Sequence, residues 1–279
     1  MLYLLLAIVS SAAISILMRL SGKYIRNNMA MFMANYGACL CLARLFMGGT
    51  PLFTRESGIW LAVLLGVGSG ILYLGGFFLL EQNMRKNGVV LSATFMKLGV
   101  LVPTILAMLV FQERPTLVQI LGIGIAVAAI ILIHFEKEGL SQGSKKVWLI
   151  FLLLVSGFSD SMANLYDKTG APGLKEHYLF YTFLAALLLS LALAVGKKKR
   201  ITSLDLLFGL LIGIPNYFSA RFLLLALGQV PAVVVYPVYS VATIVLISLA
   251  GFLGFQEKCS RRKGLALLLI LVSLLLLNL

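Results

Sequence analysis

The hydrophobic and polar positions of this chain form long, continuous apolar runs that are separated by short polar connections. Ten of these runs are long enough to cross the hydrocarbon core of a bilayer, which needs roughly 20 apolar residues per helix. Because the apolar positions are continuous rather than alternating, they predict membrane helices and not the strands of a membrane barrel. The predicted helices cover residues 2–20, 29–47, 58–80, 88–111, 117–135, 147–166, 177–195, 204–227, 232–255 and 264–279.

One long segment of this pattern occurs twice. Residues 89–133 consist of an apolar run, the polar break Phe111-Gln112-Glu113-Arg114 and a second apolar run. Residues 233–277 repeat this plan 144 positions later (233 minus 89), with Phe255-Gln256-Glu257-Lys258 at the break. A repeat of such long period indicates two copies of one structural unit.

The repeat defines the predicted fold class and the domain organisation. We predict an all-α membrane protein of ten transmembrane helices, with residues 1–138 and 145–279 as two five-helix repeats joined by a polar connector. Because five is an odd number, the second copy enters the membrane from the opposite side, and the two copies form an inverted repeat.

Composition and charge support a membrane protein. Hydrophobic residues make up 61% of the chain and charged residues 12%, whereas soluble proteins carry about a quarter charged residues. The net charge of +13 arises in short loops, where membrane topology and anionic lipid explain it, so no nucleic-acid partner is expected. The odd-numbered loops and their flanks carry sixteen Lys and Arg residues against five in the even-numbered loops. This bias predicts a multi-pass protein of the cytoplasmic membrane with both termini outside.

The turn after the fourth predicted helix resembles a known family. Phe111-x-Glu113 followed by Gln119 and Gly122, together with ten helices in a five-plus-five repeat, resembles the drug/metabolite transporter superfamily, EamA type. The second copy keeps the Phe-x-Glu turn at 255–257 but departs from the pattern at 263–264. The resemblance implies a transporter whose central cavity is lined by the first, third, fourth, sixth, eighth and ninth helices, and it says little about the substrate.

Lys97 is the first candidate for substrate binding. It lies near the middle of the fourth predicted helix and shares a helix face with Thr94, which is a second candidate. A cation at this depth costs about 2.5–3.5 kcal/mol on insertion scales, so it must face a wet cavity, an anion or backbone carbonyls. A structural lysine that is neutralised by a neighbour remains the alternative.

Asp160 and Arg221 form the second candidate pair. They lie in the sixth and eighth predicted helices, at similar heights, and their repeat counterparts Ser15 and Phe77 are uncharged. We predict that the two charges interact directly or through a shared water. This interaction has two interpretations, a structural ion pair and a substrate-binding or proton-coupling pair.

Four uncharged residues complete the candidate substrate site. Tyr73 and Tyr217 occupy matching positions of the two copies, Tyr239 lies in the ninth predicted helix, and Asn164 takes the repeat position of Arg19. Cavity lining and core packing are both open for the tyrosines.

Other features of the chain have structural interpretations. Gly66, Gly68 and Gly70, and likewise Gly209 and Gly213, provide small faces for close helix approach. The carboxylates of Glu113 and Glu257 each precede a new helix and are expected to cap its amides. Pro103, Pro215 and Pro237 are expected to interrupt their helices.

These observations favour a secondary active transporter that moves a small polar metabolite by alternating access. Lys97, Arg221 and Arg19 against Asp160 and Glu81 favour an amino acid or a related organic anion. The alternatives are an exporter of a cationic or neutral compound with Asp160 as the proton-linked site, and a membrane scaffold that transports nothing. Clustered nucleophiles and spaced metal ligands are absent from the sequence, so we expect no enzyme, no cofactor and no metal. The expected partners are the substrate and the lipid bilayer, with a coupling proton and a homodimer left open.

Overall fold

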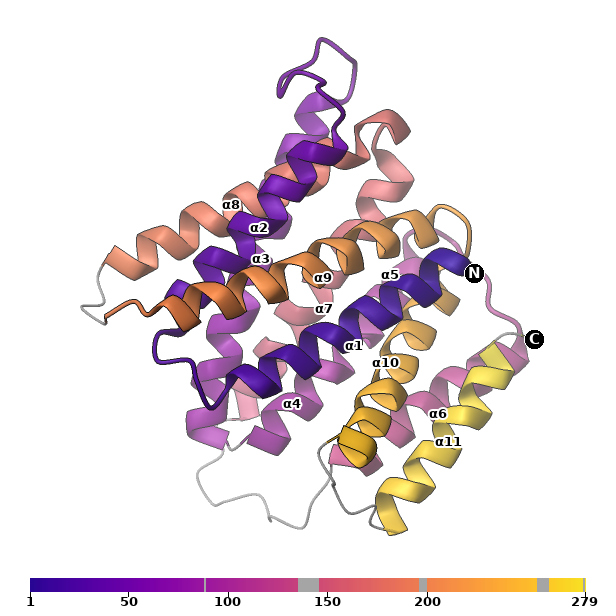
Figure 1. Ribbon diagram of the computed structural model, residues 1–279. Coiled ribbons are helices and arrows are strands. Elements are labelled where there is room, and N and C mark those ends of the chain that lie inside the picture. Colours follow the sequence, from indigo (N-terminus) through magenta and orange to yellow (C-terminus); the bar gives the residue numbers. More distant parts are fainter. Residues whose placement is uncertain (88, 135–145, 196–199, 255–260, 278) are drawn as a thin grey trace. The chain divides into compact units, whose positions relative to one another are not determined.

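The computed structural model describes residues 1–87, 89–134, 146–195, 200–254, 261–277 and 279 (Figure 1). Every regular element of these residues is a helix, so the all-helical prediction is confirmed. In chain order the elements are α1 (Leu2–Ser21), α2 (Asn28–Phe46), α3 (Ile59–Asn87), α4 (Val89–Leu98), α5 (Leu101–Leu109), α6 (Leu117–His134), α7 (Lys146–Thr169), the short 3-10 helix η1 (Pro172–Leu174), α8 (Lys175–Val195), α9 (Ser203–Leu227), α10 (Ala232–Gly254) and α11 (Arg261–Leu277).

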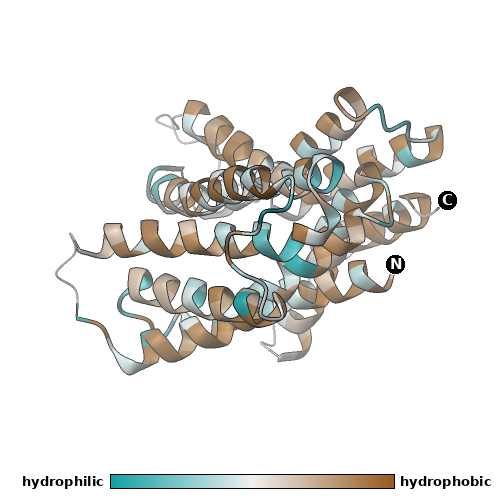
Figure 2. Ribbon diagram, turned by 90° about the horizontal axis from the view of Figure 1, so that it is seen from above, coloured by the Kyte–Doolittle hydropathy of each residue, from teal (hydrophilic) through white to brown (hydrophobic). Residues whose placement is uncertain are grey.

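The helices have the length and the apolar character of membrane spans. Seven segments of the described residues are long and apolar enough to cross a bilayer, and three shorter apolar helices cover Phe95–Leu109, Leu117–Leu132 and Gly264–Leu277. Figure 2 shows that hydrophobic residues predominate along the helices. The number of ten spans and the inverted repeat stay predictions.

Two predicted helices differ most from the structure. The segment predicted as one helix over residues 88–111 is divided into α4 and α5, and the third helix continues past residue 80 to Asn87. The extension of α3 carries polar residues, which lie beyond the apolar run from which the prediction was made. The division of the fourth helix has a local cause, which is given with the candidate site.

The chain forms two compact units. Unit 1 comprises Met1–Leu74 and Met162–Gln229, and unit 2 comprises Gly75–Ser161 and Val230–Leu279. Each unit therefore takes helices from both halves of the sequence and does not coincide with either predicted repeat. The repeats 1–138 and 145–279 describe the sequence, and their structural equivalence stays a prediction.

Close helix contacts in unit 1 depend on glycine, as the sequence predicts. A Cβ atom at Gly66 of α3 would lie 2.8 Å from the Tyr178 carbonyl oxygen of α8, and one at Gly70 would overlap the Thr182 carbonyl oxygen. Gly209 and Gly213 of α9 bring that helix equally close to α2. Gly68 is different, because nothing lies within 4 Å of the corresponding Cβ position.

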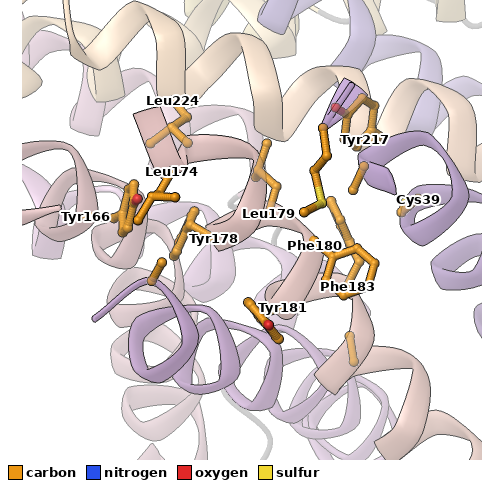
Figure 3. Close-up of a cluster of buried hydrophobic side chains, with 14 of the residues drawn as sticks. Cys39, Tyr166, Leu174, Tyr178, Leu179, Phe180, Tyr181, Phe183, Tyr217 and Leu224 are labelled. Atoms are coloured by element: carbon orange, nitrogen blue, oxygen red, sulfur yellow. The ribbon is translucent and has the colours of Figure 1, made fainter. Parts of the chain in front are cut away.

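The core of unit 1 is rich in tyrosine and phenylalanine (Figure 3). Tyr166 of α7 stacks on Tyr178 of α8 with ring centroids 4.4 Å apart, and the Tyr178 hydroxyl donates to Ser69 Oγ at 3.2 Å. Tyr217 of α9 is fully buried in the same cluster, close to Phe183. Burial of these large rings makes unit 1 a well-packed body.

Gln119 and Gly122, which follow the Phe111-x-Glu113 turn, make structural contacts in unit 2. Gln119 forms a reciprocal cap with Thr116 at the start of α6, because each side-chain oxygen accepts the backbone N–H of the other residue. Gly122 lets α11 approach α6, and its carbonyl oxygen accepts a hydrogen bond of 2.8 Å from the buried Ser273 hydroxyl. The helices α6 and α11 run side by side in Figure 1.

Candidate functional site

A break between α4 and α5 lies directly beside Lys97. The backbone turns tightly at Gly99 and Val100, whose N–H groups donate to the Met96 and Lys97 carbonyl oxygens at 3.1 and 3.3 Å. Pro103 is the cause, because a proline clashes with the carbonyl four residues before it and cannot donate to it. The proline is tolerated in the first turn of α5, where its missing N–H is not needed.

The prediction that prolines interrupt helices is therefore right only for Pro103. Pro215 and Pro237 lie inside α9 and α10, and both helices continue through them. The difference is physical: a continuous helix with proline loses one hydrogen bond, whereas the fourth segment also offers Gly99, whose backbone turns readily, at the site of the clash.

Helix α7 packs its backbone against this break. A Cβ atom at Gly157 would lie 2.5 Å from both the Gly99 carbonyl oxygen and the Val102 Cβ, so only glycine fits there. One residue earlier in α7, the Ser156 hydroxyl donates to the Met96 carbonyl oxygen at 3.3 Å. These contacts hold α7 at the turn and bring its next residues opposite Lys97.

Lys97 and Asp160 are the charges that meet at this place. Both side chains are partly buried, and they interact electrostatically. Within the described part of the chain, however, no hydrogen bond or ion pair joins them directly. The lysine also lies in the last turn of α4, where the helix dipole favours a cation. The site thus holds two opposite charges close enough to attract each other but not in contact.

Helix α10 fixes the backbone of Asp160. The hydroxyl of Tyr236, which is 1% exposed, donates to the Asp160 carbonyl oxygen at 2.6 Å. The N-terminus of α10 is held in turn by the Glu113 carboxylate, whose Oε2 accepts the Val233 N–H at 3.0 Å. The sequence predicts that Glu113 caps the helix that follows it, but the structure shows it capping α10, because Thr116 and Gln119 already cap α6. Glu257 lies outside the described residues.

A partly buried cation of unit 1, Arg221, has a direct partner. Arg221 of α9 donates from Nε to Glu176 Oε1 of α8 at 2.6 Å, and the Tyr217 hydroxyl donates to Glu176 Oε2 at 2.7 Å. The guanidinium carbon lies 4.4 Å from the centre of the Phe46 ring, a cation–π contact. The side chains of Arg221 and Glu176 are 23% and 20% exposed. Charge, hydrogen bond and ring together satisfy the arginine within its own unit.

The eight predicted site residues are divided equally between the units. Sequence reasoning paired Asp160 with Arg221, but the structure gives each of them an opposite charge inside its own unit. Glu176 is the residue that this reasoning missed, because it lies at the start of α8, next to the predicted helix boundary. Its signal was a carboxylate in the first turn of a helix, where the dipole favours an anion.

The uncharged residues predicted for the substrate site differ in burial and in hydrogen bonding. Tyr217 belongs to the Glu176 cluster, while Tyr73 and Tyr239 are partly buried and each has an interaction partner. Asn164 is 1% exposed, and neither amide atom has a hydrogen-bond partner in the described residues. The side chain of Thr94 lies outside what the structure describes. Tyr73, Asn164, Tyr217 and Arg221 therefore belong to unit 1, and Thr94, Lys97, Asp160 and Tyr239 belong to unit 2.

Comparison with known proteins gives a family match for the N-terminal part of the chain. Residues 1–135 match the model of the EamA-like transporter family. The match covers 135 of the 279 residues of the chain. The EamA-like match and the apolar helices together indicate a multi-pass membrane protein. The matched range contains Lys97 and Glu113, but it ends before Asp160 and Tyr236.

Two further similarities extend over most of the chain. An uncharacterized protein of Haemophilus influenzae is 24% identical over 226 residues, which are 79% of this chain and 75% of the relative. A crystal structure of another protein matches with a TM-score of 0.77 at 12% identity, over 99% of this chain and 94% of its own. At this identity the structural likeness concerns the fold alone.

Proposed function

We propose that the protein is a secondary active transporter that carries a small polar metabolite across the cytoplasmic membrane by alternating access. The observation that carries this proposal is the pair of opposite charges, Lys97 and Asp160, at the break between α4 and α5. Charged groups inside membrane segments are expensive and mark substrate or ion pathways. Discontinuous membrane helices are the elements from which many transporters build their binding sites.

An amino acid is the favoured substrate. Arg221 was part of the argument for an organic anion, but Glu176 neutralises it at 2.6 Å. What remains is one cation and one anion without direct contact, an arrangement that complements a molecule bearing both charges. In this proposal Lys97 binds the carboxylate of the amino acid and Asp160 binds its ammonium group.

The proposed cycle uses the inverted repeat and the charge bias of the loops. Two copies that enter the membrane from opposite sides can expose one central site to each side in turn. The excess of Lys and Arg in the odd-numbered loops supports an orientation with both termini outside. A reporter fused at Leu279 that is active only in the cytoplasm would contradict this orientation.

Counterflow in proteoliposomes tests the function. Purified protein is reconstituted in vesicles preloaded with each of the common amino acids, and exchange with the labelled external form is measured. We expect exchange of at least one amino acid, with loss in Lys97→Met and in Asp160→Asn. The matched control is Lys23→Met, which removes an exposed lysine after α1 and should leave exchange unchanged. The absence of exchange for every amino acid would reject this substrate class.

A second candidate function rests on Asp160 alone. Since no ion pair occupies its carboxylate in the described residues, Asp160 is available to carry a coupling proton in an exporter of a cationic or neutral compound. Such a protein would lose pH-driven accumulation in Asp160→Asn while keeping exchange without a pH gradient. If exchange without a pH gradient is lost to the same extent in Lys97→Met and in Asp160→Asn, the amino-acid carrier is supported instead.

A further inference from the structure

We infer that Glu113 is a positioning residue for the Lys97–Asp160 site, to which it is connected through Val233 and Tyr236. This inference rests on the proposed function, because it concerns the site at which that function would operate. The sequence and the family-like motif suggest only a local cap for Glu113. The structure instead places its carboxylate on a helix that begins 119 positions later in the chain (232 minus 113).

The first step is that α10 lacks a side-chain cap of its own. Pro231 precedes the helix, and although its carbonyl oxygen accepts the N–H groups of Val234 and Val235 at 3.0 Å each, proline has no side-chain acceptor. The N–H of Val233 donates to Glu113 Oε2 at 3.0 Å. A carboxylate at this position satisfies an otherwise unpaired donor and also meets the positive end of the helix dipole.

The second step is that the first turn of α10 is weak on its carbonyl side. Pro237 lies four residues after Val233 and has no N–H, so the Val233 carbonyl loses its ordinary partner within the helix. The Val233 N–H therefore depends on Glu113 for its hydrogen bond, and the Val233 carbonyl receives no hydrogen bond from Pro237. This makes the turn from Val233 to Tyr236 more dependent on the Glu113 cap than the first turn of an ordinary helix.

The third step leads from this turn to the charges. Tyr236 follows Val233 by three residues and donates its hydroxyl to the Asp160 carbonyl oxygen at 2.6 Å. On the same segment of α7, Gly157 packs against Gly99 of the break that follows Lys97. A displaced Tyr236 would release one of the contacts that anchor this segment, and the spacing between the Asp160 carboxylate and the Lys97 ammonium would change.

The test compares two caps that lie three residues apart. Glu113→Ala removes the cap of α10, and the matched control Thr116→Ala removes the cap of α6 at the same turn without a connection to Tyr236. In counterflow of the amino acid that exchanges fastest, we expect Glu113→Ala to raise the half-saturating concentration about fivefold, the factor set by a typical cap energy. Thr116→Ala should leave it unchanged, although both variants lose similar thermal stability. Glu113→Gln should restore normal affinity, because its amide oxygen still accepts a hydrogen bond.

Two further measurements keep the inference falsifiable if Glu113→Ala folds poorly. Tyr236→Phe should raise the half-saturating concentration similarly. The double variant Glu113→Ala/Tyr236→Phe should have a half-saturating concentration no higher than that of the more impaired single variant, as expected for residues in one chain of contacts. Infrared bands of Asp160, assigned by their loss in Asp160→Asn, should shift in Glu113→Ala and Tyr236→Phe but not in Thr116→Ala. Unshifted bands in both variants, or equal affinity in Glu113→Ala and Thr116→Ala, would overturn the inference. If the bands shift but no amino acid exchanges, the proposed substrate class fails and the positioning role stands.

Discussion

The two units of this protein handle charge inside a membrane in opposite ways. In unit 1, Arg221 has a carboxylate at 2.6 Å and an aromatic ring at 4.4 Å, and Lys175 has Asp167 at 2.6 Å. In unit 2, Lys97 and Asp160 attract each other without a direct bond in the described residues. A direct partner offsets much of the free energy that a cation costs inside a membrane segment. A cation without a direct partner keeps that cost, which marks it as a candidate functional residue.

The comparison separates structural charges from candidate functional charges. The pairs of unit 1 lie near helix ends, at the first residues of α8, in the last turn of α7 and within two turns of the end of α9. The charges of unit 2 lie at a break inside an apolar segment, next to backbone that only glycine permits. We therefore expect substitutions in unit 1 to change stability first and substitutions in unit 2 to change transport first.

The largest expected effect is the loss of transport in Lys97→Met. Methionine matches the length of lysine without its charge, so the packing of α4 should survive while an anionic group of the substrate loses its partner. We expect a decrease in exchange of more than about 100-fold, the size typical for removal of a charged contact in a closed site. Lys97→Arg should remain well below the wild type, because the guanidinium has a different donor geometry. Unchanged exchange at equal protein level would reduce Lys97 to a structural cation.

The next effect, in unit 1, concerns stability. Arg221→Met leaves the Glu176 carboxylate without its cation, and Glu176→Gln leaves the arginine without its anion. Each change should cost about 2–3 kcal/mol, somewhat less than for a fully buried pair because both side chains are partly exposed. The double variant Arg221→Met/Glu176→Gln should recover most of the loss in unfolding experiments in detergent. Independent, additive losses would show that the two residues are not coupled.

The sequence predicts the helices of this fold better than it predicts which side chains contact each other. Continuous apolar runs locate the helices, and the spacing of Gly66 and Gly70 correctly indicates a close helix contact, because both depend on residues near each other in the chain. The partner of Arg221 could not be found in this way. Asp160 and Glu176 are both carboxylates in neighbouring segments, and the choice between them depends on packing that sequence alone does not contain.

The interior of the fourth predicted helix shows a second limit. In one uninterrupted helix, i+3 and i+4 spacing would place Thr94, Lys97 and Thr104 on a shared polar face. The turn at Gly99 and Val100 divides this segment, so residues after the turn no longer follow the helical register of Lys97. Thr104, expected on the same face as Lys97, is buried and donates its hydroxyl to the Val100 carbonyl oxygen at 2.9 Å. The role of Lys97 stays a prediction, and the residue could be singled out from the sequence because recognising an isolated charge in an apolar run requires no knowledge of the fold.

A smaller effect tests the close packing of unit 1 with a control on the same helix. Gly70→Ala places a methyl group against the Thr182 carbonyl oxygen and the Ala185 side chain of α8, so the helices must separate. Overpacking of this kind costs typically about 1–3 kcal/mol. Gly68→Ala meets no atom within 4 Å and should be neutral or slightly stabilising, since alanine favours the helix. Equal melting temperatures for the two variants would contradict the close α3–α8 contact.

The smallest effect distinguishes the ring contact of Arg221 from its salt bridge. Phe46→Leu removes the aromatic face under the guanidinium but keeps an apolar side chain, and a cation–π contact at a partly exposed site contributes about 0.5–1 kcal/mol. The same substitution also weakens ring contacts with Tyr217 and Phe218, which lie 5.6 and 5.8 Å away between centroids. Measuring Phe46→Leu again in the Arg221→Met/Glu176→Gln background removes the cation and leaves only those ring contacts. We expect a smaller destabilisation in that background, and the difference between the two measurements is the contribution of the cation. Equal destabilisation in both backgrounds would assign Phe46 to ring packing alone and leave Glu176 and Tyr217 to satisfy the arginine cluster.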